Sequence, residues 1–239
     1  TATTPTGIGA LASRSTPSGG SALLLAAQES RTRIKQQAAA LLGCSAESLA
    51  IGEAGVRNAE GALLGWDELA RATNDACAAE VAYEAAGEAW GFGCCLAVVS
   101  LDPETGAPRV EQIFYVDDAG LLVNPLLAEG QIHGGIAQGL GEALLERLVY
   151  SKDGQLLTGS LMDYALPRAS DMPALHLDHY ETPSPCNPLG ARGLGETGTI
   201  GAPPAILNAV LDALSPDRLE RVELPLGSET LWRVLQGKR

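Results

Sequence analysis

Four glycines lie between residues 134 and 141 of the segment 127–149, whose apolar residues otherwise follow helical spacing. Ile132, Ile136 and Leu140 recur at steps of four, which predicts the core-facing stripe of an α-helix. The glycines are Gly134, Gly135, Gly139 and Gly141. Each glycine inside a helix costs about 1 kcal/mol relative to alanine, so four of them indicate close approach of a partner to the backbone. That partner is either a second helix or a large planar ligand.

The face of this helix that lies away from the apolar stripe carries two amides beside bare backbone. Gln131, Gly134, Gly135 and Gln138 are separated by three- and four-residue steps, which place them on one side. Amide side chains both donate and accept hydrogen bonds, as recognition of a planar polar ligand requires. Helix–helix packing is the commoner use of such glycines, and these residues alone leave both interpretations open.

Composition excludes several classes of partner. A formal net charge of −13, with only 16 basic residues scattered along 239, argues against nucleic acid and anionic membranes. No apolar run approaches the roughly 20 residues that span a bilayer, and no signal peptide opens the chain, so we expect a cytoplasmic protein. The five cysteines lack the spacing of a metal or iron–sulfur site, which predicts reduced thiols.

Periodicity and turn residues along the chain predict an α+β fold with a mixed sheet. We expect one domain over 1–239, with possible lobes at 1–84 and 85–239. The expected elements are helices over 21–42, 66–73, 127–149 and 228–235 and from Pro203–Pro204 onward, short strands within 48–66, a hairpin of 94–101 with 109–116, and strands at 156–158, 175–180 and 221–224.

A second glycine-rich stretch, Gly-Leu-Gly-Glu-Thr-Gly at 193–198, holds a carboxylate at Glu196. Its spacing matches the dinucleotide fingerprint, which needs a hydrophobic strand leading directly into the glycines. Here the approach contains Pro183, Pro185 and Pro188, which a central strand excludes. Glu196 would also place negative charge where phosphates bind. The turn is therefore better interpreted as bare backbone that presents one carboxylate, although an exposed acid on a surface turn has the same sequence.

A third segment precedes the first helix and offers groups suited to an anion. Residues 12–16 read Ala-Ser-Arg-Ser-Thr and are followed by Gly19 and Gly20. Hydroxyls, backbone N–H groups and one guanidinium can bind phosphate there. Ordinary N-capping of the helix explains the same residues equally well.

These segments together resemble one family, the molybdenum hydroxylases of the xanthine dehydrogenase, aldehyde oxidase and aerobic carbon monoxide dehydrogenase group. Three blocks carry the resemblance and stand in the family's order: 12–16, then 123–125 with 129–141, then 187–198 with 201–206. The blocks span nearly the whole chain. They identify it as the C-terminal half of a molybdopterin-binding domain.

The resemblance implies a role for each block. Glu196 takes the position of the general base that acts on a hydroxyl at molybdenum, while the pterin dithiolene holds the metal and no protein side chain ligates it. Residues 12–15 would bind the pterin and its phosphates, and the bare helix face would lie against the pterin or its nucleotide tail. The cofactor-binding residues implied are Ala12, Ser13, Arg14, Ser15, Gln131, Gly134, Gly135, Gly193 and Gly195.

The resemblance also implies partners. The cofactor is expected in its cytosine dinucleotide form, with two-iron, two-sulfur clusters and FAD on partner subunits. A second molybdenum-domain chain is needed, because the family's substrate-gating loop and a further glutamine-glycine motif have no match here. We expect a split-gene subunit or a processed fragment, and Thr1 is compatible with removal of an initiator methionine. The expected substrate is a small aldehyde or N-heterocycle.

Two departures and three alternatives accompany this resemblance. Arg192 stands where relatives commonly have lysine, and Ala119 where cysteine is frequent; neither is expected to touch the chemistry. The chain could instead be a non-catalytic scaffold half of such a complex, or belong to a carbon monoxide-oxidising relative. An unrelated nucleotide-binding module would require bound NAD or FAD.

Overall fold

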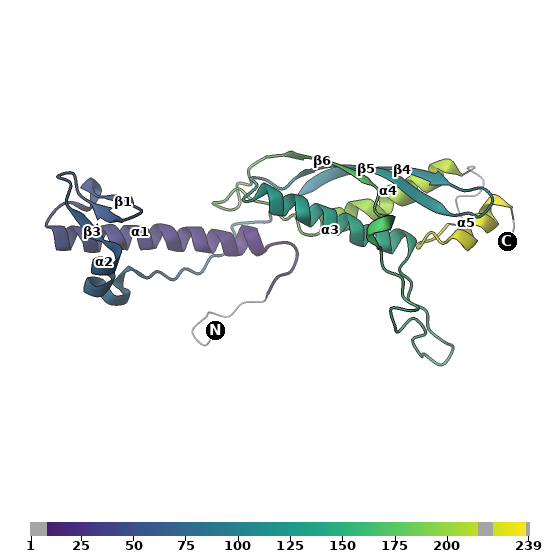
Figure 1. The fold of residues 1–239 in the computed structure, drawn as a ribbon, viewed down its shortest axis with the longest axis horizontal. Helices are drawn as coiled ribbons and strands as arrows, with labels where there is room; N and C mark the ends of the chain where they lie inside the picture. Colours follow the sequence, from purple (N-terminus) through teal and green to yellow (C-terminus); the bar gives the residue numbers. More distant parts are fainter. Residues whose placement is uncertain (1–8, 215–221, 238–239) are drawn as a thin grey trace.

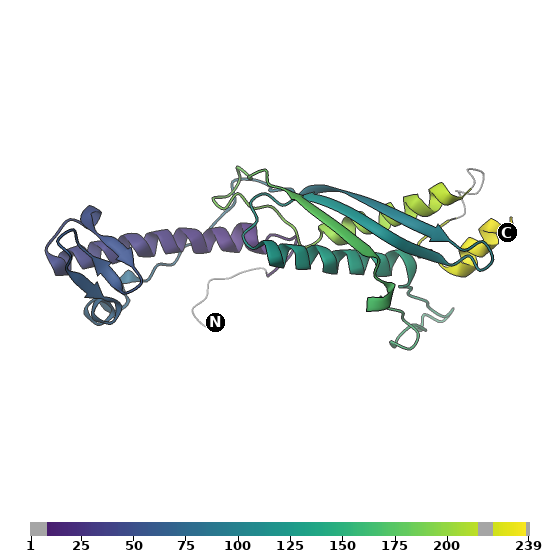
Figure 2. The ribbon, with the colours of Figure 1, turned by 45° about the horizontal axis from the view of Figure 1, so that its top comes forward.

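The computed structural model describes residues 9–214 and 222–237. Within them the chain forms two bodies at the ends of an elongated molecule, connected by helix α1 and by the extended segment that follows residue 77 (Figure 1). Figure 2 shows the same separation from a second direction. Each body has its own hydrophobic core. The expected division between residues 84 and 85 stays a prediction.

The N-terminal body confirms the predicted short strands and helices. The elements of the chain up to residue 77 are the π-helical turn η1 (Ser15–Gly20), α1 (Ser21–Leu42), η2 (Ala46–Ser48), β1 (Ala50–Gly52), β2 (Gly55–Arg57), β3 (Leu63–Gly65), α2 (Trp66–Thr73) and η3 (Asn74–Cys77), and those from the second half of α1 onward form the body. The three strands form an antiparallel sheet. Gly43 ends α1 in the left-handed conformation, with φ of 65°. The burial of apolar side chains varies along α1, since Leu23 is 71% exposed while Ala38 is buried.

The C-terminal body is built on one mixed sheet, as predicted. β4 (Phe92–Leu101) pairs antiparallel with β5 (Pro108–Asp118), and β5 pairs parallel with β6 (Ala174–Tyr180). Side chains on one face alternate inward, including Ile113 and Tyr115, which are 0% and 4% exposed. This face is covered by α3 (Pro125–Leu144) and α4 (Thr197–Ala213), and the short η4 (Ala169–Asp171) and α5 (Ser228–Leu235) complete the body.

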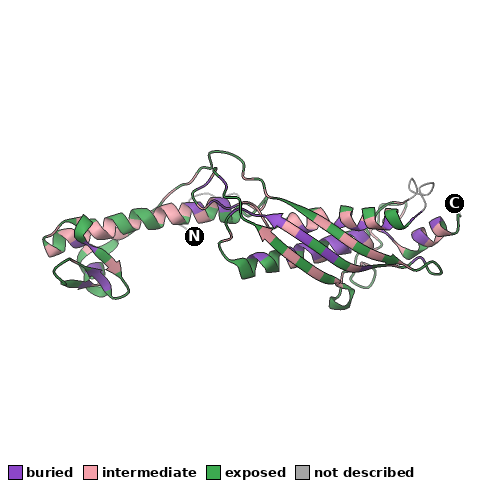
Figure 3. Ribbon diagram, turned by 90° about the horizontal axis from the view of Figure 1, so that it is seen from above, coloured by how far each residue is buried: buried purple, intermediate pink, exposed green. Residues whose placement is uncertain are grey.

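The core of this body lies between the sheet and the two long helices, where Figure 3 concentrates the buried residues. Ile132, Ile136 and Leu140 are at most 1% exposed, which confirms the predicted stripe of α3. α3 begins at Pro125, two residues before the expected start at 127. Asn124 caps it by accepting a hydrogen bond from the Leu127 backbone at 3.1 Å, and a proline follows at the first helical position.

Glycines allow α3 and α4 to cross closely. A Cβ built on Gly198 would lie 2.7 Å from the backbone nitrogen of Ile136, and one on Gly135 would lie 3.0 Å from the Cα of Gly198. A Cβ built on Gly139 would likewise lie 2.9 Å from the Cδ of the Pro203 ring. The bare backbone at Gly135 and Gly139 therefore serves helix packing. Gly134 is exposed, with nothing within 4 Å of its Cβ position, so it remains available to a ligand.

This difference predicts opposite effects for two neighbouring substitutions. Gly135→Ala is expected to lower the free energy of unfolding by about 1–3 kcal/mol, because the added methyl meets backbone that cannot yield without separating the helices. Gly134→Ala should raise it by about 0.5–1 kcal/mol through helix propensity alone. Thermal unfolding of both variants measures the contrast. Equal effects of the two changes would contradict the packing role of Gly135.

Four expectations about element bounds were wrong in part. α3 ends at Leu144 rather than 149, because the backbone nitrogens of Leu145 and Glu146 both donate to the Gly141 carbonyl and close the last turn. α4 begins at Thr197, so its two prolines lie inside the helix, where packing on Gly139 offsets the lost hydrogen bonds. The expected strand at 156–158 is only an isolated bridge. Of 221–224, position 221 lies outside the described residues and 222–224 are not a strand.

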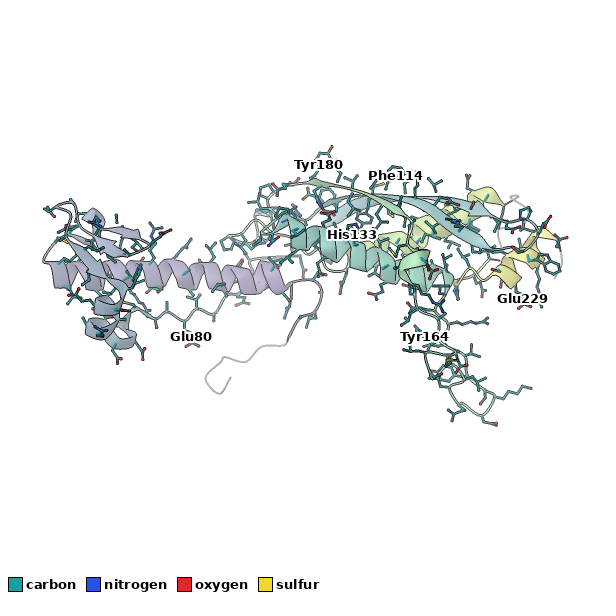
Figure 4. All side chains as sticks on the ribbon, viewed as in Figure 1. Glu80, Phe114, His133, Tyr164, Tyr180 and Glu229 are labelled. Carbon is teal, nitrogen blue, oxygen red and sulfur yellow. The ribbon has the colours of Figure 1, made fainter. Side chains whose placement is uncertain are left out.

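The other face of the main sheet is open. Phe114 and Tyr180 are 40% and 69% exposed, and Figure 4 shows both pointing away from the helices. The Phe114 ring stacks on His176 of the neighbouring strand, with centroids 4.5 Å apart. No helix in the described ranges is long and apolar enough to cross a membrane.

Candidate functional site

The first and third sequence blocks pack against each other. A Cβ on Gly193 would lie 3.0 Å from the Ser13 Cβ, and one on Gly195 would lie 3.3 Å from the Ser13 Oγ. Ala12 and Ser13 both adopt the left-handed region, with φ of 50° and 54°, a conformation uncommon outside glycine. Two glycines in the turn thus make room for a strained serine loop, which residue spacing alone could not reveal.

Ser13 holds a polar atom without a partner. Its Oγ is buried and makes no hydrogen bond to any part of the chain that the structure describes. Gln131 of α3 approaches the same point, since its Oε1 lies 3.7 Å from the Cβ position of Gly195. A buried hydroxyl without a partner carries a free-energy cost unless another group supplies the hydrogen bond. These residues therefore form a polar cradle suited to a ligand from outside the chain.

A cavity of about 470 Å³ opens beside this cradle. Its lining combines polar side chains with apolar residues, several of which belong to the β5–α3 connection. The polar lining residues are Ser13, Ser15, Thr16, Asn124, Gln131, Arg192 and Glu196. Such a mixture of a few polar groups on a largely apolar wall is typical of cofactor sites.

A second cavity of about 650 Å³ shares Ser13 and Glu196 with the first, and we call the packed segments 12–13 and 193–197 between the two cavities the ridge. The walls of the second cavity include Ala12 and Arg14, the turn at Gly193, and the segment around Trp90. Glu196 is exposed, and it caps the N-terminus of α4 through its backbone carbonyl, which accepts from Ile200 at 3.0 Å. Its side chain is thus placed on the ridge between two open volumes.

The ridge is supported from β5 by Asp118, which is 1% exposed. Its Oδ1 accepts hydrogen bonds from the backbone nitrogens of Gly120 at 2.9 Å and Thr182 at 3.1 Å, and Arg192 Nε lies 3.9 Å away. Burial opposes the charge of this carboxylate. The hydrogen bonds from Thr182 and Gly120 and the nearby guanidinium of Arg192 outweigh it, so the pKa of Asp118 lies below its ordinary value.

For Asp117, the residue before Asp118, burial outweighs the interactions that stabilise the charged carboxylate. Its Oδ1 lies 3.0 Å from Nδ1 of His179 on β6, while its Oδ2 is buried without a hydrogen bond among the described residues. Burial raises the pKa of Asp117 above its ordinary value, although the hydrogen bond and charge of His179 act against the rise. On β6, His179 therefore lies on the inward face and His176 on the open face.

Most of the predicted site residues line one of the two cavities. Ser13, Ser15, Gln131, Gly195 and Glu196 line the smaller cavity. Ala12, Arg14 and Gly193 line the larger one. Gly134 is open on the same helix as Gln131, and Gly135 is buried against α4.

Sequence reasoning missed two contributors to the ridge, Arg192 and Asp118. Arg192 was noted only as a departure from a family pattern. The signal for Asp118 was a pair of adjacent acids at the end of a buried strand, which costs free energy unless hydrogen bonds or cations satisfy them.

The described residues contain no group of three or more His, Cys, Asp or Glu side chains arranged to hold a metal ion. All five cysteines are free. The unpartnered Ser13 hydroxyl and the open backbone of the glycines around it suit a bulky polar ligand.

Comparison with known proteins gives consistent matches. The family described as molybdopterin cofactor-binding domain matches residues 1–173. The nicotine 6-hydroxylase large subunit of Paenarthrobacter nicotinovorans is 45% identical over 140 residues, 59% of this chain and 17% of that protein. The carbon monoxide dehydrogenase large chain of Hydrogenophaga pseudoflava is 32% identical over 99% of this chain and 31% of that protein.

A solved structure extends the likeness to the fold. Quinoline 2-oxidoreductase from Pseudomonas putida 86 superposes with a TM-score of 0.83 at 36% identity, covering 100% of this chain and 32% of that one. The chain spans less than a third of the length of each of these relatives.

Proposed function

Since the chain belongs to the molybdopterin-binding family of the molybdenum hydroxylases, we propose that it forms one wall of a molybdopterin site and supplies the general base of a hydroxylation. The observation that carries the proposal is the convergence of Ser13, Gln131 and Glu196 on one cavity from three distant parts of the chain. The cofactor would supply a molybdenum centre that accepts two electrons and delivers water-derived oxygen.

In this proposal the loop at 12–15 and the α3 amide bind the pterin. The buried Ser13 hydroxyl gains the hydrogen bond that it lacks, and Gln131 contributes a second polar contact beside it. Arg14, exposed on the other side of the ridge, is available to a phosphate of the cofactor. We infer the cytosine dinucleotide form of molybdopterin, and the open backbone at Gly134 would be available to its pterin or to its nucleotide.

Glu196 has the location that a base requires. It stands on the ridge, exposed to both cavities, next to glycines that leave room for a bulky group. The overall reaction breaks one substrate C–H bond and one O–H bond of water, forms a C–O bond, and releases two electrons and two protons. Glu196 accepts a proton as the C–O bond forms, so that the attacking oxygen carries more negative charge.

The proposed working form is an assembly. A second molybdenum-domain polypeptide would complete the cavity, because both volumes open to solvent on this chain and Glu196 is exposed. Two-iron, two-sulfur clusters and FAD on further subunits would carry the electrons away. We place the complex in the cytoplasm, and we propose an aldehyde or an aromatic N-heterocycle as the substrate class, with carbon monoxide oxidation as the alternative.

Metal and pterin analysis of the purified assembly tests the proposal. About one molybdenum and one pterin dinucleotide for each copy of this chain are expected of a single mononuclear site. An assembly that forms normally yet holds neither would favour the scaffold function. Bound NAD or FAD on this chain, without pterin, would favour a nucleotide-binding module.

A further inference from the structure

The turn that carries Glu196 is closed on itself. The backbone nitrogen of Thr197 donates to the Leu194 carbonyl at 3.2 Å, and the Thr197 hydroxyl donates to the same carbonyl at 3.0 Å. Residues 194–197 therefore move as one unit, with Glu196 inside it. The position of the carboxylate then depends on how the two ends of this unit are attached to the rest of the fold.

Arg192 attaches the upstream end. Its backbone nitrogen donates to the Ala119 carbonyl at 2.7 Å, while its side chain donates from Nη1 to the Trp90 carbonyl at 2.7 Å and from Nε to the Thr182 carbonyl at 3.1 Å. The side chain is only 16% exposed, and its charge lies near the buried Asp118. One guanidinium thus joins three separate segments immediately before the turn, which its fixed donor geometry permits.

Tyr115 of β5 attaches the downstream end. Its hydroxyl donates to the carbonyl of Thr197 at 2.6 Å, and its ring packs where a Cβ on Gly201 would lie 2.9 Å from Cε2. Tyr115 is 4% exposed, so its ring is held by the core of the main body. The hydroxyl therefore connects the first residue of α4 rigidly to the central strand of the sheet.

We infer that Arg192 and Tyr115 are positioning residues for Glu196, and that together they fix the turn against the sheet so that the carboxylate projects from the ridge between the cavities. The inference rests on the proposed function of Glu196. The inference adds two residues to the site. The Tyr115 hydroxyl and two donors of the Arg192 guanidinium bind backbone carbonyls, so these groups position the turn without contacting the cofactor or the reacting atoms.

The test uses the assembled, cofactor-loaded complex with single and double variants. Tyr115→Phe removes one hydroxyl without changing the ring. Arg192→Gln removes the guanidinium, and Arg192→Lys restores the charge with fewer donors. We expect kcat to fall about tenfold or more in Tyr115→Phe and Arg192→Gln, with KM and molybdenum content unchanged, because displacing a reacting group by a fraction of an ångström slows the chemistry. Arg192→Lys should lie between Arg192→Gln and wild type.

Combining these substitutions with Glu196→Gln tests whether Tyr115 and Arg192 act by positioning the carboxylate or by stabilising the protein in general. If the two residues act through the carboxylate, adding Tyr115→Phe to Glu196→Gln should not lower the remaining single-turnover rate further. Losses that multiply in the double variant would overturn the inference. Normal turnover in Glu196→Gln itself would instead overturn the proposed function of that residue, so the two failures are distinguishable.

A second readout does not depend on activity. Backbone amide exchange over 193–197 should accelerate in Arg192→Gln and Tyr115→Phe, because the turn loses an attachment. Tyr83→Phe is the matched control, since the Tyr83 hydroxyl donates to the Cys186 carbonyl at 3.0 Å outside the turn. Arg33→Lys is the control for arginine, because Arg33 binds Glu29 and the Ala78 carbonyl far from the ridge. Unchanged exchange at 193–197 in both test variants would contradict the attachment.

Discussion

Glu196→Gln is expected to lower the turnover of the assembled enzyme by about 10²- to 10⁴-fold, the usual contribution of a general base. Glutamine has nearly the same size as glutamate and keeps the backbone cap of α4, so the ridge should retain its shape. In the proposed reaction, the amide cannot accept the proton that leaves the attacking oxygen. Molybdenum and pterin content should stay at the wild-type level, because the cofactor contacts proposed here come from Ser13, Gln131 and their neighbours.

Glu129→Gln is the matched control for this substitution. Glu129 lies exposed in the first half of α3, one residue before Gly130, and lines neither cavity of the ridge. Glu129→Gln makes the same change of charge at a residue that has no access to the proposed reaction. Steady-state rates per molybdenum should therefore be unchanged in Glu129→Gln. Comparable rates in both variants would remove Glu196 from the mechanism.

The parts of the fold that depend on local spacing could be predicted from the sequence. The stripe of Ile132, Ile136 and Leu140 gave α3 its buried face, and the reversal after Asp102 gave the β4–β5 hairpin. Bounds that depend on tertiary contacts could not. Pro203 looked like a helix start, yet α4 begins six residues earlier because Gly198 and Gly139 let the two helices cross closely.

The residues of the candidate site likewise include some that could be predicted from the sequence and some that could not. The roles of Glu196, Ser13 and Gln131 could be predicted only because their three blocks resemble the molybdenum hydroxylases, since the residues alone leave other interpretations open. The roles of Arg192 and Tyr115 could not, since each acts on backbone carbonyls supplied by segments 10 to 102 residues away. Nothing in the local sequence indicates which carbonyls a long side chain will reach. Those contacts follow only once the sheet and the two helices are assembled.

The adjacent acids at the end of β5 should respond to substitution in opposite directions. Asp118→Ala leaves the backbone nitrogens of Gly120 and Thr182 without their acceptor, and each buried donor left unpaired costs about 1–3 kcal/mol. We expect the free energy of unfolding at pH 7 to fall by about 3 kcal/mol. Asp117→Asn should raise the free energy of unfolding or leave it equal, because it removes a buried charge whose second oxygen has no partner among the described residues.

The direction of each pKa shift determines how the contribution of each carboxylate to the free energy of unfolding changes with pH. The pKa of Asp118 is lowered on folding, so its stabilisation is present above the unfolded value of about 3.9 and is lost as pH falls through the folded value. The pKa of Asp117 is raised, so its ionisation costs stability that develops as pH rises above about 3.9. Denaturant unfolding between pH 3 and 7 should therefore show both variants approaching wild type in acid. A loss in Asp117→Asn as large as that in Asp118→Ala would contradict this prediction and show that the Asp117–His179 pair stabilises the end of β5 as much as the Asp118 contacts do.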